Sequence, residues 1–466
     1  MTGLYAGVDI GTSSCRCIVF DENGFEKHAF SVEYSLITSK IGYAELNAEE
    51  ICSAFNEVVK NAKKIGVKTF GLSCQMHSLI AVDKNGNAMT NVITWADTRA
   101  ADEAVYISQN FDVQKLYEKT GCRTSHPMYP LSKILWLKKN LDNFENVFKF
   151  ITIKEYIIYR LCGEFIVDMT LASSQGYYNL NDFCWDEEIL TDILGISINK
   201  LSRVVECDYT FSDNSNSKYI IGSGDGILAN YGCGIVDDTM LSSTIGTSGA
   251  IRTAVNKPLL DVSQRTWCYA FKKDMWVAGG AINNGGIALK WLRSILDGDY
   301  RTYDILASDI PVGSEGLVFL PVITGERSPD WRSDVRGMML NIDIRHERKH
   351  IIRACMEGVV YRLFSIYEVM AALNKNAVSI IANGGYVKSD VWLQIQADVF
   401  GKEIIVNHVS ECSALGAAYM AMQTDNFNGK LKAFEPIKHI KPNMENHEQY
   451  KEYYANAIKL YNKVNG

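Results

Sequence analysis

The tetrapeptide Ile-Gly-Thr-Ser occurs twice in this chain of 466 residues, and its repetition strongly constrains the fold. The copies lie at residues 10–13 and 245–248, each between two short apolar runs. Residues 9–13 and 244–248 are identical at four of five positions, and the one difference is Asp9 against Thr244. Glycine and hydroxyl residues between two apolar runs predict a hairpin. Its recurrence near the chain midpoint predicts an internal duplication.

A chain of this length exceeds what one hydrophobic core usually supports, so we expect two domains, 1–242 and 243–466. Apolar spacing and turn residues predict further elements beyond the first hairpin. They are a strand at 27–34, a helix at 350–373, a strand at 377–382, a helix at 390–400, a strand at 403–407 and a helix at 445–464. Strands that alternate with helices indicate an α/β layered fold.

Composition excludes several classes of protein. The hydrophobic content of 47% suits globular domains, and a net charge of −7 argues against a nucleic-acid partner. No apolar run approaches the ~20 residues that span a bilayer, so we expect no membrane association. The 12 cysteines are scattered without a CxxC pair, and the start of the chain does not resemble a signal peptide. We therefore expect reduced thiols and a cytoplasmic protein, with a homodimer as the general expectation for oligomeric state.

The first tetrapeptide is a candidate phosphate loop. Gly11, Thr12 and Ser13 offer backbone N–H groups and hydroxyls, which an anionic phosphate needs for close approach. Asp9, just before the loop, could hold Mg²⁺ directly or through water. The alternative is a hairpin turn that only requires glycine. Two copies, the second including Gly246 and Thr247, favour the phosphate function.

A second candidate is Asp225, in the glycine-rich segment 221–226 between apolar residues. A carboxylate among glycines is accessible, as a general base for a substrate hydroxyl requires. Aspartate is also among the best helix N-caps, and a helix is expected from about residue 227. The two roles are compatible, and the sequence does not choose between them.

Two polar loops follow expected strands at 69–72 and 92–94. The first contains Met76 and His77, and the second contains Asp97 and Arg99. Such loops suit a polyhydroxylated ligand. The structural alternatives are a histidine satisfied within the core and an Asp–Arg ion pair.

Gly384 and Gly385 end the strand expected at 377–382 and precede Ser389, in the form of a nucleotide-approach loop. Neither a GxGxxG dinucleotide motif nor a Walker A loop is present, so any use of ATP requires a different architecture.

Taken in order, these motifs resemble those of the FGGY carbohydrate kinases over nearly the whole chain. The matching segments are Asp9-Ile-Gly-Thr-Ser, Gln75-Met-His, Trp95-Ala-Asp-Thr-Arg, Met128-Tyr-Pro-Leu-Ser-Lys, Asp168-Met-Thr-Leu-Ala-Ser-Ser, Gly224-Asp-Gly, Thr244-Ile-Gly-Thr-Ser-Gly, Gly325-Glu-Arg-Ser-Pro, Gly384-Gly-Tyr-Val-Lys-Ser, Gln396-Ala-Asp-Val-Phe-Gly and Ala414-Leu-Gly-Ala-Ala. The resemblance implies an α/β fold of two ribonuclease-H-like (actin-like ATPase) domains with a cleft between them. It assigns sugar binding and the catalytic base to the N-terminal domain and nucleotide binding to the C-terminal domain.

The resemblance also implies roles for individual residues. ATP and Mg²⁺ would be the cofactors, and a small sugar or sugar acid would be the acceptor. Asp225 matches the general base and Asp9 the carboxylate that faces Mg²⁺. The implied nucleotide contacts are Gly11, Thr12, Ser13, Gly246, Thr247, Gly286, Gly384, Gly385 and Ser389. The implied substrate contacts are Met76, His77, Asp97 and Asp225.

Within the family, segments 76–83, 223–230 and 244–252 are most similar to gluconate kinases, which form 6-phosphogluconate. Gln75-Met-His is equally typical of xylulose kinases, which convert D-xylulose to xylulose 5-phosphate. Those enzymes more often have Asn where this chain has Gly226. A third alternative, a non-transferring actin-like ATPase or sugar-sensing module, is disfavoured because both Asp9 and Asp225 are present.

Overall fold

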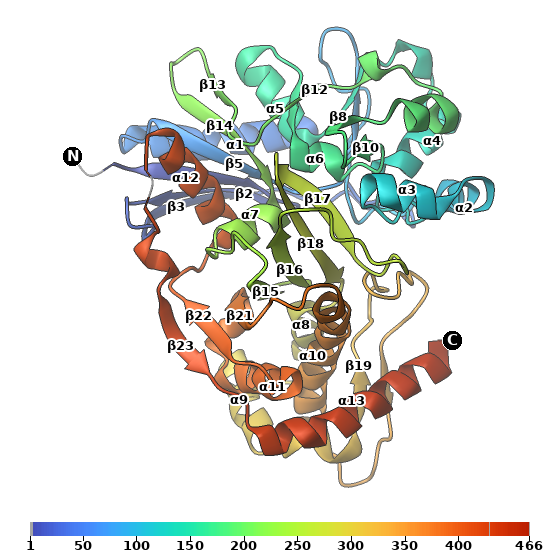
Figure 1. Cartoon of the computed structure of the whole chain (residues 1–466), viewed down its shortest axis with the longest axis vertical. Helices are drawn as coiled ribbons and strands as arrows, with labels where there is room; N and C mark the ends of the chain where they lie inside the picture. The colour runs from blue at the N-terminus through green and yellow to red at the C-terminus, as the bar shows by residue number, and fades with distance from the viewer. Residues whose placement is uncertain (1–2, 428, 466) are drawn as a thin grey trace. The chain divides into compact units, whose positions relative to one another are not determined.

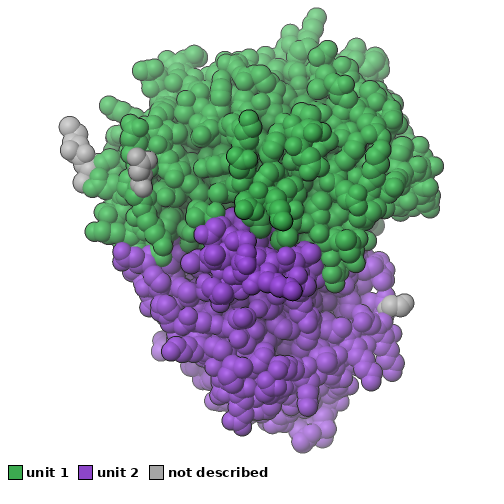
Figure 2. Space-filling view, in the orientation of Figure 1, with its two compact units in different colours: residues 1–236, 255–277, 411–434 green, residues 237–254, 278–410, 435–466 purple. Residues whose placement is uncertain are grey.

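The computed structural model describes residues 3–427 and 429–465, which form two compact units (Figures 1 and 2). Unit 1 comprises Met1–Val236, Val255–Val277 and Glu411–Phe434, and unit 2 comprises Asp237–Ala254, Ala278–Ser410 and Glu435–Gly466. The units are therefore not two continuous halves divided near residue 242. Two later segments of the chain, 255–277 and 411–434, belong to unit 1.

The central sheet of unit 1 has the strand order β13-β14-β5-β1-β2-β3. The strands are β1 Tyr5–Ile10, β2 Ser14–Phe20, β3 Glu26–Glu33, β5 Thr69–Cys74, β13 Thr210–Ser212 and β14 Lys218–Gly224. β1 pairs with β2 in antiparallel orientation, as the predicted hairpin requires. β5 lies parallel to both β1 and β14, and β13 is antiparallel to β14.

The seven-stranded sheet β17-β18-β16-β15-β21-β22-β23 repeats this arrangement along its stretch from β16 to β23, which belongs mainly to unit 2. These strands are β15 Met240–Ile245, β16 Gly249–Val255, β21 Ser379–Asn383, β22 Ile404–Asn407 and β23 Pro436–Ile440. β15 is antiparallel to β16 and parallel to β21, β21 is parallel to β22, and β22 is antiparallel to β23. The strands from β2 to β13 in the first sheet, β2-β1-β5-β14-β13, have the same relative directions as β16-β15-β21-β22-β23, which confirms the internal duplication. The alternation of strands with helices confirms the mixed α/β class.

The helices of unit 1 are α1 Ala48–Lys64, α2 Ala101–Asn110, α3 Val113–Thr120, α4 Pro130–Asn140, α5 Ile153–Cys162, α6 Met169–Ser173, α7 Asp225–Tyr231 and α12 Cys412–Thr424. Those of unit 2 are α8 Gly286–Ile295, α9 Tyr300–Ser308, α10 Arg348–Leu373, α11 Asp390–Phe400 and α13 Met444–Asn465. The remaining strands are β4 Glu45–Leu46, β6 Ile80–Val82, β7 Val92–Ile93, β8 Lys149–Ile151, β9 Ile166–Asp168, β10 Tyr178–Asn179, β11 Cys184–Trp185, β12 Arg203–Val205, β17 Trp267–Lys272, β18 Met275–Ile282, β19 Val318–Leu320 and β20 Met338–Leu340. The predicted helices at 350–373, 390–400 and 445–464 are confirmed as α10, α11 and α13. None of the helices in the described part of the chain has the length and apolar character needed to cross a lipid bilayer.

Helix α12 comes late in the chain but packs on the first strands of unit 1, where Figure 1 shows it in red beside blue strands. Gly7 on β1 and Gly71 on β5 lie side by side in register. A Cβ atom at Gly7 would lie 1.8 Å from the carbonyl oxygen of Ala414, and one at Gly71 would lie 1.9 Å from that of Ala417. Only glycine permits this approach, so the two positions determine how closely α12 packs on the sheet.

Candidate active site

The carboxyl ends of three neighbouring parallel strands carry polar residues of unit 1. Asp9 on β1 is in register with Ser73 on β5, and Ser73 is in register with Ser223 on β14. Parallel strands present their carboxyl ends at one edge of a sheet, which is where α/β folds bind ligands. Asp9, the segment 75–77 after β5 and Asp225 after β14 therefore lie along the same edge, as their predicted roles in one site require.

Asp9 presents a carboxylate near the carboxyl end of β1. It accepts a hydrogen bond of 2.6 Å from Ser73 Oγ. Burial raises the pKa of Asp9, and the bond from Ser73 and the charge of Arg16 act in the opposite direction. No group of three or more His, Cys, Asp or Glu is arranged for a metal within residues 3–427 and 429–465. One carboxylate nevertheless fits Mg²⁺, which takes few protein ligands and completes its shell with water and phosphate oxygens.

The Gly-Thr-Ser loop of unit 1 is held in place by side chains. The Gln75 amide donates to the Gly11 carbonyl at 3.1 Å, and Thr12 Oγ1 donates to Gln75 Oε1 at 3.2 Å. Trp95 Nε1 donates in turn to Thr12 Oγ1 at 3.1 Å. Ser13 is exposed at the tip. The loop is thus fixed by residues that follow β5 and β7, and Thr12 contributes its hydroxyl to that support.

Asp225 follows a bend in β14. Gly222 has φ +64°, and a Cβ atom there would lie 1.8 Å from the carbonyl oxygen of Leu72. Gly224 is the N-cap of α7 and Asp225 is the first helical residue, so of the two roles left open by the sequence the structure does not give Asp225 that of the N-cap. Its Oδ1 accepts from the N–H of Gly226 at 2.7 Å. The helix start therefore orients a partly exposed carboxylate at the sheet edge.

A buried ion pair supports the strand that leads to Asp225. Lys154 Nζ lies 2.6 Å from Asp168 Oδ2, and both side chains are 0% exposed. The same ammonium donates to the carbonyls of Ile221 at 3.0 Å and Ser223 at 3.3 Å. Lys154 has no signal in the sequence, because no spacing links it to residues that lie far along the chain.

His77 has features of both alternatives proposed from the sequence. It is buried, and its backbone adopts φ +62°. Its Nδ1 lies 2.8 Å from the carbonyl oxygen of Ser174, so Nδ1 carries the proton that it donates. The ring lies edge-on to Tyr129 and Tyr269, with centroid distances of 5.2 and 5.7 Å. A positive φ at a histidine is uncommon and marks a loop conformation that the surrounding structure imposes.

Lys133 on α4 connects the two polar loops. Its ammonium donates to the carbonyls of His77 at 3.2 Å and Thr94 at 2.7 Å. Burial lowers the pKa of Lys133 to about 7. Met76 is placed beside Asp225, because a Cβ atom on the preceding Gly224 would lie 2.7 Å from Met76 Cγ. Both loops are therefore fixed from within the unit.

Asp97 is fully buried in an ion pair. Its Oδ2 accepts from Ala44 N and Arg99 Nη2, both at 2.7 Å, and its Oδ1 accepts from the N and Nε of Arg99 at 3.1 and 2.9 Å. The guanidinium also lies 3.6 Å from the ring centroid of Tyr43. These four bonds occupy the accepting capacity of the carboxylate. Asp97 thus supports its loop in this structure, and its direct contact with a sugar stays a prediction.

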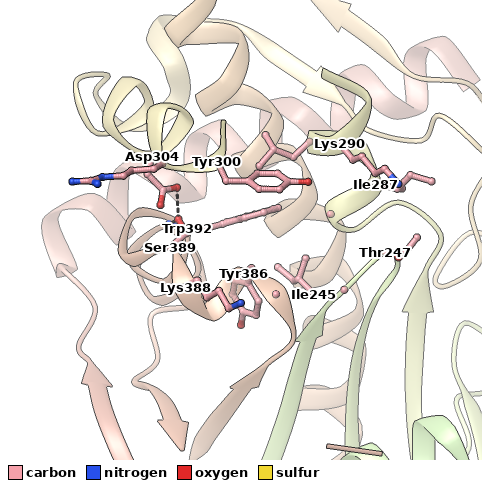
Figure 3. Close-up of a pocket in the computed structure, with 15 residues that line it drawn as sticks. Ile245, Thr247, Ile287, Lys290, Tyr300, Asp304, Tyr386, Lys388, Ser389 and Trp392 are labelled. Atoms are coloured by element: carbon pink, nitrogen blue, oxygen red, sulfur yellow. Dashed lines mark hydrogen bonds between the residues drawn. The ribbon is translucent and has the colours of Figure 1, made fainter. Parts of the chain in front are cut away.

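Unit 2 contains a cavity of about 600 Å³ (Figure 3). Gly246, Thr247, Gly286, Gly385 and Ser389, all predicted as nucleotide contacts, line it together. Gly384 does not line the cavity but forms the turn behind it. Its φ is +96°, and a Cβ atom there would lie 2.5 Å from the carbonyl oxygen of Ile245, which is too close for a side chain. The structure therefore assembles the predicted residues of the C-terminal half around one cavity.

The start of α8 forms one wall of this cavity. Gly286 is its first residue and donates its N–H to the carbonyl of Gly246 at 2.6 Å. A Cβ atom at Gly286 would lie 2.8 Å from that oxygen, so the close contact requires glycine. The N–H groups of Gly285 and Ile287 donate to the carbonyl of Thr247 at 3.1 and 3.2 Å, so the start of α8 is fastened to the 246–247 turn and places its positive dipole end there. Lys290, one helical turn later, lines the cavity as well.

Several lining residues were not identified from the sequence. They include Tyr300, Arg301, Asp304, Lys388 and Trp392. Lys388 and Trp392 flank the predicted Ser389 at one and three residues, so proximity to that motif was an available signal. Asp304 and Tyr300 belong to α9, which has no recognisable motif, and only the packing of α9 against α11 reveals them.

Comparison with known proteins agrees with this geometry. The model for the N-terminal domain of the FGGY family of carbohydrate kinases matches residues 4–222, and the model for its C-terminal domain matches residues 241–424. A gluconokinase of Bacillus subtilis (strain 168) is 36% identical over 94% of this chain and 90% of its own length. A xylulose kinase of the same organism is 28% identical over 89% of this chain and 87% of its own.

Solved structures show the same similarity. A gluconate kinase from Lactobacillus acidophilus superimposes with a TM-score of 0.93 at 32% identity, covering 100% of this chain and 98% of that one. A ligand-bound xylulose kinase from L. acidophilus gives a TM-score of 0.94 at 32% identity, covering 99% and 98%. Both halves of the chain, its paired hairpins and its full-length relatives lead to one conclusion: the chain belongs to the FGGY family of carbohydrate kinases, enzymes that use ATP to phosphorylate a carbohydrate.

Proposed function

We propose that this kinase phosphorylates gluconate to 6-phosphogluconate. The observation that carries the proposal is the 36% identity to the B. subtilis gluconokinase over 94% of the chain, against 28% for the xylulose kinase of that organism. The predicted similarity of segments 76–83, 223–230 and 244–252 to gluconate kinases agrees with it.

Asp225 is the general base in this proposal. Its carboxylate accepts the proton of the acceptor hydroxyl while the hydroxyl oxygen attacks the γ-phosphorus of ATP and ADP leaves. Phosphoryl transfer passes through a loose transition state, so positioning of the hydroxyl and neutralisation of charge dominate catalysis. The Lys154–Asp168 pair fixes the strand before Asp225 and thereby its position. Met76 and His77 are the proposed contacts to the remainder of the sugar acid.

The nucleotide is assigned to the cavity of unit 2, with the 246–247 turn and the start of α8 at its phosphates. Gly11, Thr12 and Ser13 are the proposed contacts of unit 1 to the phosphates. Asp9 is the residue proposed to hold Mg²⁺, through one carboxylate oxygen or an intervening water. When bound, the ion would neutralise negative charge on the β- and γ-phosphate oxygens.

D-Xylulose is the second candidate acceptor. A specific observation favours it: the xylulose kinase from L. acidophilus matches this chain as well as the gluconate kinase from that organism does, at 32% identity each. The two acceptors differ in charge, because gluconate carries a carboxylate. Direct comparison of the two substrates therefore separates the candidates.

The test measures ADP release by the purified protein with ATP, Mg²⁺ and gluconate, D-xylulose or glycerol in parallel. We expect the highest kcat/KM with gluconate and a product that 6-phosphogluconate dehydrogenase oxidises. Asp225→Asn should reduce kcat by about 10³-fold or more with little change in Tm, since a positioned base contributes about 10²–10⁴ in rate. Asp208→Asn, an exposed aspartate of the same unit, serves as the matched control.

A higher kcat/KM with D-xylulose than with gluconate would show that D-xylulose is the substrate. ADP release without any acceptor, and without a phosphorylated product, would favour the non-transferring ATPase instead. Near-normal turnover by Asp225→Asn would remove Asp225 as the base. A cytoplasmic location belongs to the same proposal, because ATP is supplied there, and cell fractionation checks it.

A further inference from the structure

The cavity of unit 2 has two chemically different ends. Figure 3 shows Thr247 at one end and Asp304 with Ser389 at the other, with the rings of Tyr300 and Trp392 between them. Gly246 and Gly286 line the Thr247 end, where the dipole of α8 favours an anion such as a phosphate. The aromatic side chains provide faces for a planar ring. A nucleotide with its phosphates at Thr247 would therefore direct its base towards Asp304.

Asp304 is held in one orientation by Ser389. Ser389 Oγ donates to Asp304 Oδ1 at 2.7 Å, and the same hydroxyl accepts from the N–H of Trp392 at 3.0 Å as the N-cap of α11. Ser389 is buried and Asp304 is partly exposed to the cavity. Burial raises the pKa of Asp304, although the bond from Ser389 lowers it, and a more basic carboxylate is a stronger acceptor. Within the described ranges, Oδ2 of Asp304 has no hydrogen-bond partner.

This arrangement leaves one fixed acceptor at the base end of the cavity. Adenine presents an amine, a donor, on the edge where hypoxanthine and guanine present a carbonyl oxygen. Hypoxanthine and guanine thus place an oxygen, which cannot donate, where the Asp304 carboxylate requires a donor. The amine of adenine is a donor that Asp304 Oδ2 can accept from.

We propose that Asp304 makes this kinase selective for adenine nucleotides by accepting a hydrogen bond from the exocyclic amine of the base. The inference rests on the proposed assignment of this cavity to the nucleotide. It goes beyond that assignment because it names the residue that discriminates between purines.

The test measures binding of nucleoside diphosphates to the full chain by calorimetry, without any sugar. ADP, IDP and purine riboside 5′-diphosphate have the same phosphates and ribose, and the last is ADP without its amine. We expect wild-type protein to bind ADP about ten-fold or more tightly than IDP, GDP or the purine riboside compound, since a hydrogen bond to a charged group is lost. Asp304→Ala should bring the ADP-to-IDP ratio close to one. Asp309→Asn, just beyond the same helix and outside the cavity lining, should retain the ratio.

Equal binding of ADP and purine riboside diphosphate by the wild type would overturn the inference, and this result does not depend on any variant folding. Preferential binding of GDP, or an unchanged ratio in Asp304→Ala, would overturn it as well. The outcome is separable from the proposed function. If the protein discriminates between these diphosphates but does not phosphorylate gluconate, the role of Asp304 in purine selectivity is supported and gluconate is excluded as the substrate.

Discussion

At the scale of residues, two buried lysines shape the site of unit 1. Lys154 pairs with Asp168 and holds the carbonyl of Ser223, whereas Lys133 holds the carbonyl of His77 and has carbonyl oxygens as its hydrogen-bond partners. Burying an ammonium is costly unless hydrogen bonds or an opposite charge compensate it. Both lysines donate to backbone carbonyls of segments that carry candidate site residues, and they fix the conformation of those segments.

The buried Lys133 predicts a particular pH dependence of stability. Burial lowers its pKa from 10.5 in the unfolded chain to about 7 in the fold, so between these values the unfolded state binds more protons. Stability therefore rises with pH in this window, by up to about 1.4 kcal/mol per pH unit. Below about pH 7 Lys133 is protonated in both the folded and the unfolded state, so it no longer makes the stability depend on pH. Urea unfolding of wild type and Lys133→Met at several pH values should show the wild type gaining relative to the variant from pH 7 to 10.

Lys139→Met is the control for this prediction, because Lys139 lies on the same helix with its side chain 62% exposed. Its difference from wild type should change little over that range. A constant difference between wild type and Lys133→Met would show that Lys133 is charged in the fold at these pH values.

At the scale of elements, α12 illustrates how glycine permits close packing. Gly7 and Gly71 open the face of β1 and β5 to the backbone of α12. α7 makes a similar approach, since a Cβ atom at Gly232 would lie 1.9 Å from the carbonyl oxygen of Cys412, and one at Gly416 would lie 2.2 Å from that of Leu228. β1 leads to Asp9 and α7 begins at Asp225, so the position of α12 bears on both elements.

Gly71→Ala is expected to destabilise unit 1 by at least about 3 kcal/mol, because the added methyl overlaps a backbone oxygen that cannot move without shifting α12. Gly163→Ala is a matched comparison, with φ +75° and no atom within 4 Å of the added Cβ. It tests conformational strain alone and should cost about 1 kcal/mol. Urea unfolding followed by circular dichroism measures both. Equal effects would show that the packing of α12 tolerates a side chain at Gly71.

At the scale of the whole molecule, the two units repeat one hairpin and have diverged at equivalent positions. In unit 1, Asp9 is in register with Ser73 and accepts its hydrogen bond. In unit 2, Thr244 is in register with Asn383 and donates to it at 2.7 Å. The hydrogen bond between the paired strands is retained, but only the first copy offers a carboxylate. Mg²⁺ is therefore proposed at unit 1.

A homodimer remains the prediction for the oligomeric state, because closed symmetric dimers are the commonest assemblies of soluble enzymes. The chain has a mass of 52.2 kDa, so sedimentation equilibrium should report about twice that value. A mass that stays at the single-chain value at micromolar concentration would show that this protein is a monomer.

Much of the architecture was predictable because its signals are local. The hairpin at 10–13, helix α11 and the duplication follow from period, turn residues and repetition, which operate over a few neighbouring residues. The motifs around Asp9, Asp225 and Gly384 were likewise visible, since each follows a strand directly.

The amino-acid sequence alone thus determined the fold class, the duplication and the family of this protein. Only the tertiary structure decided that residues 411–434 return to unit 1, that Asp97 is committed to Arg99, that Lys133 and Lys154 are buried, and that Asp304 faces the cavity of unit 2. The physical reason is that burial and pairing depend on groups brought together from distant parts of the chain. The repeated Ile-Gly-Thr-Ser announces two similar turns, but the neighbours that pack around each turn give them different chemistry.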